Sequence, residues 1–146
     1  MCRILLVDDE PDVRAVIGRR LTREGFGIDE ADSAAAAAER IRETDPPYDA
    51  IIADMVMETE ESGMEVLKAA FARDIFAEVI VLTAYGSVQN AVECMKRGAF
   101  DYIEKNIPGV DVLDLMVLKI QNALEHRRSA VDFLQRIDVR RGQLSS

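Results

Sequence analysis

This sequence of 146 residues has few cysteines that could crosslink the chain and no apolar segment long enough to cross a membrane. Its two cysteines, Cys2 and Cys94, form no CxxC pair and no cluster with histidine, so neither a disulfide framework nor a structural zinc site is indicated. The longest apolar run, residues 34–38, is far shorter than the roughly 20 residues of a membrane span. Acidic residues 8–10 follow the first apolar segment directly, which excludes a secretory signal. We therefore expect a cytoplasmic protein without membrane contact.

Residue types that mark fibrous or disordered chains are also scarce. Eight glycines and four prolines accompany 49% apolar and 31% charged residues, a composition that fits one folded domain. Basic side chains are outnumbered, with 18 against 27 acidic ones and a net charge of −9. Because so acidic a chain repels the phosphate backbone, we expect no direct binding of nucleic acid by this segment.

Short apolar runs alternate with stretches of helical spacing along the chain. Residues 50–53 and 79–82 are apolar throughout, as in strands covered on both faces, whereas residues 27–31 alternate like an edge strand. Ser33 and Ser87 stand where helices should begin. The pattern predicts strands at residues 4–7, 27–31, 50–53, 79–82 and 100–103, and helices at residues 12–24, 33–43, 63–73, 88–97 and from Val112 onward.

Strict alternation of strands and helices predicts an α/β fold with a parallel sheet. Right-handed crossovers and two covered faces leave few topologies. We therefore predict a doubly wound, five-stranded parallel sheet of order 2-1-3-4-5, with five flanking helices and an extended C-terminal helix. Gly25 and Gly98 are expected to end helices within it.

Polar residues begin where the predicted strands end, and the carboxyl ends of parallel strands share one edge of the sheet. They are Asp8, Asp9, Asp54, Thr83 and Lys105. Any one of these residues could simply cap a helix, but their joint occurrence indicates a site. Carboxylates forced together repel one another, and a hard divalent cation such as Mg²⁺ (or Mn²⁺) relieves the repulsion.

Lys105 would add a fixed charge for phosphoryl oxygens at this edge, and Thr83 an adjustable hydroxyl donor. Together with the metal they describe a phosphoryl-transfer site, in which Asp54 is the candidate nucleophile.

Four stretches of the chain, residues 4–11, 53–57, 82–86 and 98–105, carry a family resemblance. From residue 3 to about residue 128, the chain resembles the receiver domains of two-component response regulators, whose sheet has this flavodoxin-like or CheY-like order. The sequence of residues 84–105 is most similar to that of receivers attached to AAA+ enhancer-binding transcription activators. The resemblance implies a phosphoacceptor signalling domain rather than an enzyme, with a histidine kinase or phosphotransfer protein and a downstream effector as partners.

The resemblance also assigns roles to single residues. It implies that Asp54 accepts the phosphoryl group, that Asp9 ligates Mg²⁺ directly and Asp8 through water, and that Asp54 and the backbone carbonyl of Val56 complete the protein ligands. The phosphoryl-contacting and switch residues would be Thr83, Ala84, Tyr102 and Lys105. Tyr102 could equally be a core aromatic residue of a strand.

The chain departs from the family pattern at two places. Glu58 replaces the usual proline after the acceptor, and Gly63 comes one residue later than in the family. Asn106 replaces the proline after Lys105. Neither change removes a residue of the phosphorylation site.

Three other functions are less consistent with these residues. An aspartate-nucleophile phosphatase needs an acid two residues after the nucleophile, where this chain has Val56. A flavodoxin-like cofactor binder needs a glycine-rich or hydroxyl-rich phosphate loop, where this chain has acidic residues 8–10. A receiver that signals without phosphorylation would not need the charged site residues that are present here.

We assign residues 1–125 to the receiver domain and residues 126–146 to a C-terminal helical extension or linker. Apolar residues with alternating spacing of 4 and 3 continue into it, with an interruption at Arg127: Leu113, Val117, Ile120, Leu124, Val131 and Leu134. This stripe predicts a stalk that pairs two chains into a homodimer. Five arginines in the extension leave open the rival arrangement, in which it folds back on the acidic body. We expect output through the fourth helix, fifth strand and fifth helix.

Overall fold

The computed structural model describes the chain except for residues 56, 58–60, 84–87 and 145–146. Strands and helices alternate throughout, as the sequence predicts. The elements are β1 (Arg3–Val7), α1 (Pro11–Arg23), β2 (Gly27–Ala31), α2 (Ala34–Glu43), β3 (Ala50–Asp54), α3 (Ser62–Arg73), β4 (Val79–Thr83), α4 (Val88–Lys96), β5 (Asp101–Glu104) and α5 (Val112–Leu144).

The five strands form one parallel sheet of order β2-β1-β3-β4-β5, which confirms the predicted fold class. The apolar runs place the strands to within one residue. Strands β3 and β4 each run one residue past the predicted end, because backbone pairing continues through Asp54 opposite Leu82 and through Thr83 opposite Glu104. Strand β5 begins at Asp101 rather than at Phe100.

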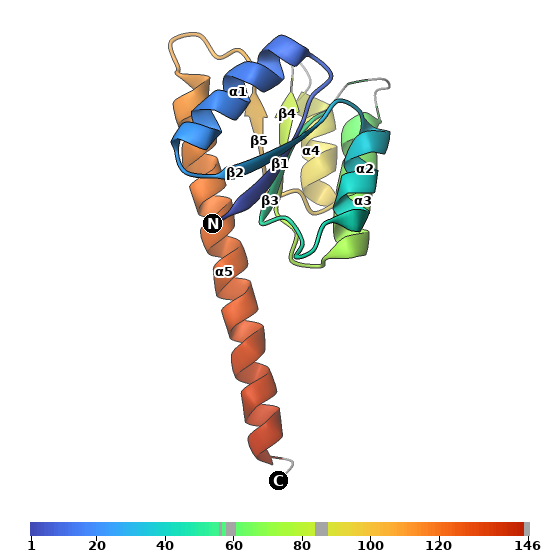
Figure 1. Cartoon of the computed structure of the whole chain (residues 1–146), viewed down its shortest axis with the longest axis vertical. Helices are drawn as coiled ribbons and strands as arrows, with labels where there is room; N and C mark the ends of the chain where they lie inside the picture. The colour runs from blue at the N-terminus through green and yellow to red at the C-terminus, as the bar shows by residue number, and fades with distance from the viewer. Residues whose placement is uncertain (56, 58–60, 84–87, 145–146) are drawn as a thin grey trace.

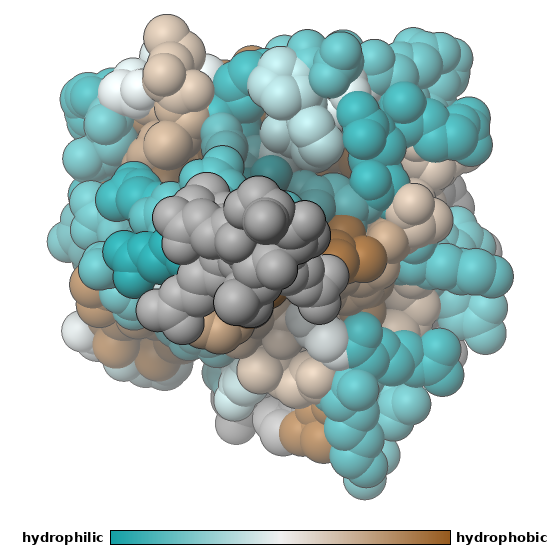
Figure 2. Space-filling view, turned by 90° about the horizontal axis from the view of Figure 1, so that it is seen from below, coloured by the Kyte–Doolittle hydropathy of each residue, from teal (hydrophilic) through white to brown (hydrophobic). Residues whose placement is uncertain are grey.

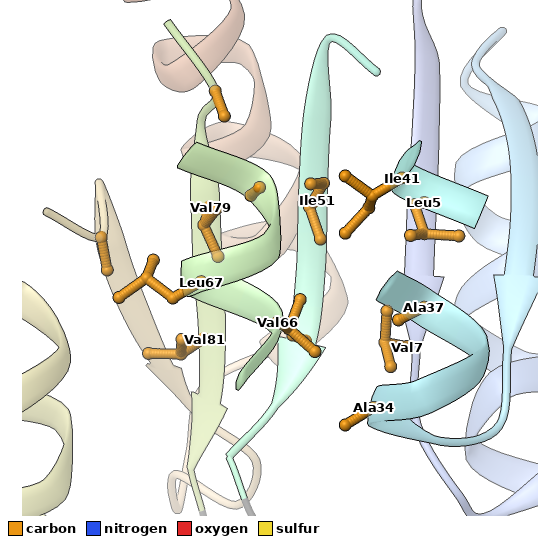
Figure 3. Packing of buried hydrophobic residues seen from close by; sticks show 14 of the residues in the cluster. Leu5, Val7, Ala34, Ala37, Ile41, Ile51, Val66, Leu67, Val79 and Val81 are labelled. Carbon is orange, nitrogen blue, oxygen red and sulfur yellow. The ribbon is translucent and has the colours of Figure 1, made fainter. Parts of the chain in front are cut away.

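Two apolar clusters cover the two faces of the sheet. Helices α2, α3 and α4 pack on one face, over Leu5, Ile51 and Val81 (Figure 3), while α1 and α5 pack on the other, over Ile4 and Ile80 (Figure 1). Alternate residues of β1, β3 and β4 thus enter opposite clusters, as in a parallel sheet buried on both sides. Each fully buried aliphatic side chain contributes about 1.5–3 kcal/mol to this packing.

Three residues that the sequence predicts at helix ends stand at helix ends in the structure. The Ser33 side chain accepts a hydrogen bond from the backbone N–H of Ala36 at 3.0 Å, which confirms the predicted cap of α2. Gly25 and Gly98 follow helices with φ of +95° and +105°, a conformation that side chains other than glycine rarely adopt. The cap predicted at Ser87 lies outside the described residues.

Helix α5 is a single helix of 33 residues whose second half projects away from the body (Figure 1). Its apolar stripe has two parts. Val117, Ile120 and Leu124 are buried against the sheet of their own domain, whereas Leu134 is 42% exposed and Phe133 beside it is 65% exposed. Two chains could therefore pair only through the distal part of the stripe, because the proximal part is already buried. None of the described helices is long and apolar enough to cross a membrane.

Candidate phosphoryl and metal site at the carboxyl edge

The topology brings the predicted polar residues to one edge of the sheet. Asp8 directly follows β1, Asp54 ends β3 and Thr83 ends β4, the three central strands. Lys105 follows β5, and its backbone N–H donates to the carbonyl oxygen of Thr83 at 2.8 Å. This bond continues the ladder between β4 and β5, so the sheet itself sets the position from which Lys105 reaches inward.

Four carboxylates form an acidic cluster at this edge: Asp8, Asp9, Glu10 and Asp54. Each offers an oxygen within 4.8 Å of the oxygens of the others. Asp8 and Asp54 are buried, at 0% and 5% exposure, while Asp9 and Glu10 are exposed. Asp8 and Asp54 therefore form a buried floor of the cluster, and Asp9 and Glu10 form a rim that is exposed to solvent.

Lys105 lies in the middle of the acidic cluster. Its Nζ donates to Oδ2 of Asp54 at 2.8 Å, and it stands 3.2 Å from Oδ2 of Asp8 and 3.9 Å from Oε1 of Glu10. Burial by itself lowers the pKa of Lys105, but the hydrogen bond to Asp54 and the charges of Asp54 and Asp8 outweigh it, so the net pKa is raised. Lys105 is therefore a firmly charged ammonium at neutral pH.

Backbone hydrogen bonds fix the loop after β1. The Asp8 N–H donates to the carbonyl of Ala31 at 3.1 Å, and Oδ1 of Asp8 accepts from the N–H of Glu10 at 3.0 Å. Arg14 donates from Nη1 to the carbonyl oxygen of Asp8 at 2.6 Å. Asp8 is thus held from β2, from its own loop and from α1, which makes its carboxylate a rigid part of the site.

A close approach of α3 fixes the chain after Asp54. The Gly63 N–H donates to the carbonyl of Met55 at 3.1 Å, and a Cβ at Gly63 would lie 2.9 Å from Cα of Met55. Only glycine allows this contact without displacing the backbone next to Asp54. Gly63 therefore packs against the segment that follows Asp54, although it comes one residue later in the sequence than the corresponding glycine of the family.

The remaining predicted residues lie outside the acidic cluster or outside the described residues. Thr83 is 2% exposed at the end of β4. Tyr102 is partly buried in β5 and packs against the cluster that includes α4, in agreement with the core-aromatic interpretation. Val56 and Ala84, with Glu58 in the same loop as Val56, lie outside the described residues.

Sequence reasoning missed two contributors. Glu10 joins the acidic cluster, and the signal for it was the unbroken acidic run that begins at Asp8. Arg14 bonds the Asp8 carbonyl and lies 3.5 Å from Glu30, but an arginine in an amphipathic helix carries no signal for such a role.

The chemistry of the acidic cluster fits a divalent cation. Among the described residues, four carboxylates face the ammonium of Lys105, so negative charge exceeds positive charge in the cluster when all of these groups are ionised. In the part of the chain that the structure describes, Oδ2 of Asp8 is buried, and its nearest cation is the ammonium of Lys105 at 3.2 Å. An all-oxygen donor set without histidine or cysteine suits Mg²⁺ or Mn²⁺.

The acidic cluster and Lys105 lie at the carboxyl edge of a doubly wound sheet, which is where α/β domains of this class build their binding sites. Residues 4–117 match the family model described as the response regulator receiver domain. The chain belongs to this family, which works in two-component phosphorelay signalling. The phosphatase hypothesis gains no support from the match.

Curated relatives and a solved structure agree with the assignment. The chain is 34% identical over 123 residues to the regulatory protein AtoC of Escherichia coli, covering 84% of this chain and 25% of that protein. It is 30% identical over 135 residues to a putative NtrX-like response regulator of Rickettsia bellii, covering 92% of this chain and 28% of the relative. A receiver domain from Clostridium thermocellum superposes with a TM-score of 0.78 at 31% identity, covering 89% and 99% of the two chains. The chain thus spans about a quarter of the length of these curated relatives.

The roles that the family resemblance implies for Asp8 and Asp9 lead to a prediction about Mg²⁺ affinity. We expect Asp9→Ala to weaken binding more than Asp8→Ala, because a direct ligand loses a coordination bond, whereas loss of an outer-shell partner typically costs about 10- to 100-fold. Titration with Mg²⁺, followed by amide chemical shifts, measures both dissociation constants. Asp12→Ala, an exposed aspartate in the first turn of α1 outside the acidic cluster, is the control and should bind normally. Equal losses in Asp8→Ala and Asp9→Ala would contradict the assigned roles.

Proposed function

We propose that this receiver domain accepts a phosphoryl group on Asp54 from the phosphohistidine of a histidine kinase or of a phosphotransfer protein. The observation that carries the proposal is the hydrogen bond of 2.8 Å between Lys105 and Asp54 inside the acidic cluster. Asp54 is the last residue of β3, the middle strand of the sheet. The contact with Lys105, at 2.8 Å for Asp54 against 3.2 Å for Asp8, supports Asp54 as the nucleophile.

The reaction at Asp54 is an in-line displacement at phosphorus. A carboxylate oxygen forms the new bond to phosphorus while the bond from phosphorus to the donor's imidazole nitrogen breaks, and that nitrogen keeps the electron pair. Lys105 holds the acceptor in place beforehand and afterwards balances charge on the phosphoryl oxygens. We propose that self-catalysed transfer and hydrolysis of the aspartyl phosphate are the domain's only chemistry.

We further propose that Asp8, Asp9, Asp54 and the backbone carbonyl of Val56 hold Mg²⁺ or Mn²⁺. The bound ion would neutralise charge on the phosphoryl oxygens and so lower the electrostatic barrier to attack by a carboxylate. The buried Oδ2 of Asp8 and the rim position of Asp9 support this set. Thr83, Ala84 and Tyr102 would respond to the phosphoryl group, with Thr83 and Tyr102 on the neighbouring strands β4 and β5.

A groove beside the site offers a place for the phosphodonor. It has a volume of about 450 Å³ and lies between α1 and α5, with an apolar floor that includes Val13, Ile17 and Met116. Lys105 and Glu10 also line it. A donor helix that buries apolar side chains there would present its phosphohistidine next to Asp54, in the cytoplasm where we expect both proteins.

Output is proposed through α4, β5 and α5, toward a downstream effector protein or domain. Val92 and Met95 of α4 and Leu118 of α5 are 45%, 37% and 54% exposed, so this side of the molecule presents apolar side chains. Lys119 joins α5 to β5, because its Nζ donates to the carbonyl of Tyr102 at 3.0 Å and pairs with Asp101 at 3.0 Å. A change at Tyr102 would therefore reach α5 directly.

The distal half of α5 supports a homodimer. Most of the stability of a helix in a protein comes from packing of its apolar face, and an exposed apolar stripe on a projecting helix is stabilised by burial against a partner. Leu134 of this stripe and the adjacent Phe133 are both exposed. We propose a second copy of the chain as the partner, through the stalk that residues 126–146 form.

Phosphorylation can be tested without the kinase. With acetyl phosphate and Mg²⁺ we expect the intact mass to rise by one phosphoryl group, because the site supplies acceptor, metal ligands and Lys105. The gain should vanish in Asp54→Asn and in EDTA, and persist in Asp12→Asn. A gain that survives in Asp54→Asn, or that is equal in EDTA, would overturn the assignment.

Dimerisation can be tested by sedimentation of the full chain, with and without beryllofluoride as a phosphoryl mimic. We expect Leu134→Glu to weaken association at least tenfold, because it places a charge in the apolar stripe. Gln135→Glu adds the same charge at the next, exposed position and should leave association unchanged. A full chain that stays monomeric at high micromolar concentration in every state would rule out the stalk.

A further inference from the structure

The first turn of the extension is fastened to the body at the end of the sheet opposite to the acidic cluster. Arg127 donates from Nη1 to Oδ2 of Asp74 at 2.7 Å and to the carbonyl oxygen of Phe76 at 2.8 Å. Its Nε lies 3.7 Å from Oδ1 of Asp49. The Arg127 side chain is only 16% exposed, so this guanidinium is enclosed by the groups that it bonds.

His126 adds a second attachment beside the first. Its Nδ1 shares a hydrogen bond of 2.6 Å with Oε1 of Glu78, a carboxylate whose side chain is 7% exposed. The imidazole ring also lies 5.3 Å from the ring of Phe100, between centroids. Two consecutive residues of the extension thus bind the segment that leads into β4.

The segment that receives Arg127 is itself well ordered. Oδ1 of Asp74 accepts from the N–H of Phe76 at 2.9 Å, and the Asp74 carbonyl accepts from the N–H of Ala77 at 3.1 Å. Asp74 also ends α3, where its N–H donates to Ala70. Because the acceptors are held in place, the guanidinium meets a preformed site and pairing costs little additional order.

These contacts explain why Arg127 interrupts the apolar stripe. Ile120 and Leu124, two turns and one turn earlier, are buried against the sheet, and Arg127 follows them on the same face of α5. At this position the facing surface is no longer apolar but consists of carboxylates and a carbonyl. Figure 2, which views the molecule from below, shows mostly hydrophilic residues at this end, with small hydrophobic patches between them.

We propose that His126 and Arg127 form a latch with residues 74–78, which holds the extension as a rigid arm of the receiver rather than as a flexible tether. The structural body then reaches past Glu125, and the direction of the arm is set by the segment before β4. Whatever the extension binds is thereby placed at a fixed orientation to the sheet. This inference does not depend on phosphorylation of Asp54.

Amide hydrogen exchange and ¹⁵N relaxation of the full, unphosphorylated chain test the latch. In Arg127→Met, amides of residues 127–134 should exchange at least tenfold faster than in the unmodified chain, because local opening no longer breaks the charged bonds. The same amides should also tumble faster than the body. Arg128→Met removes an exposed arginine at the next position and should leave both measurements unchanged.

Asp74→Asn tests the latch from its other side. This variant keeps Oδ1 for Phe76 but removes the charge that Arg127 binds, so the same amides should exchange faster. The double variant with Arg127→Met should add little, since both changes remove one interaction. Unaltered exchange and tumbling in both single variants, or equal effects of Arg127→Met and Arg128→Met, would overturn the proposal. If Arg127→Met does not fold, Asp74→Asn decides the matter alone.

Discussion

Repulsion among carboxylates at the carboxyl edge of the sheet is the constraint on which the site depends. Asp8 and Asp54 are buried there because they continue strands that are covered on both faces. Lys105 makes this tolerable by placing one ammonium against both carboxylates. Among the described residues, one ammonium faces four carboxylates, and this excess of negative charge supports the proposal that the site binds a divalent metal and, with the metal, a phosphoryl group.

Helix α5 connects the two ends of the molecule. Val112 and Leu113, at its beginning, line the groove that also contains Lys105. Its middle packs under β1, β3 and β4, and it leaves the body where Arg127 bonds Asp74. The site and the extension are therefore at opposite ends of one helix.

The fold could be predicted from the sequence because local patterns and topology agree. Residues 50–53 and 79–82 are apolar throughout, and such runs in alternation with helices have few arrangements other than a doubly wound parallel sheet. The convergence of Asp8, Asp54 and Lys105 followed from the same topology, since carboxyl ends of parallel strands share one edge.

The rest could not be predicted, for physical reasons. The bond between Arg127 and Asp74 joins residues 53 positions apart, and no periodic pattern links a helix residue to a loop at that distance. The sequence pattern indicates only that Arg127 interrupts the apolar stripe, whereas in the structure its side chain bonds Asp74 and Phe76 of the body. The stripe itself was interpreted as one surface, although burial divides it after Leu124. Packing partners of α5 decide both points, and they are set by tertiary structure.

Chemical location of the acyl phosphate tests the central claim most directly. Borohydride reduces an aspartyl phosphate to homoserine, which tandem mass spectrometry of peptides identifies by position. After treatment with acetyl phosphate and Mg²⁺, the account predicts homoserine at position 54 and at no other aspartate. Homoserine at position 8 or 9 in place of position 54 would show that the nucleophile has been assigned to the wrong carboxylate.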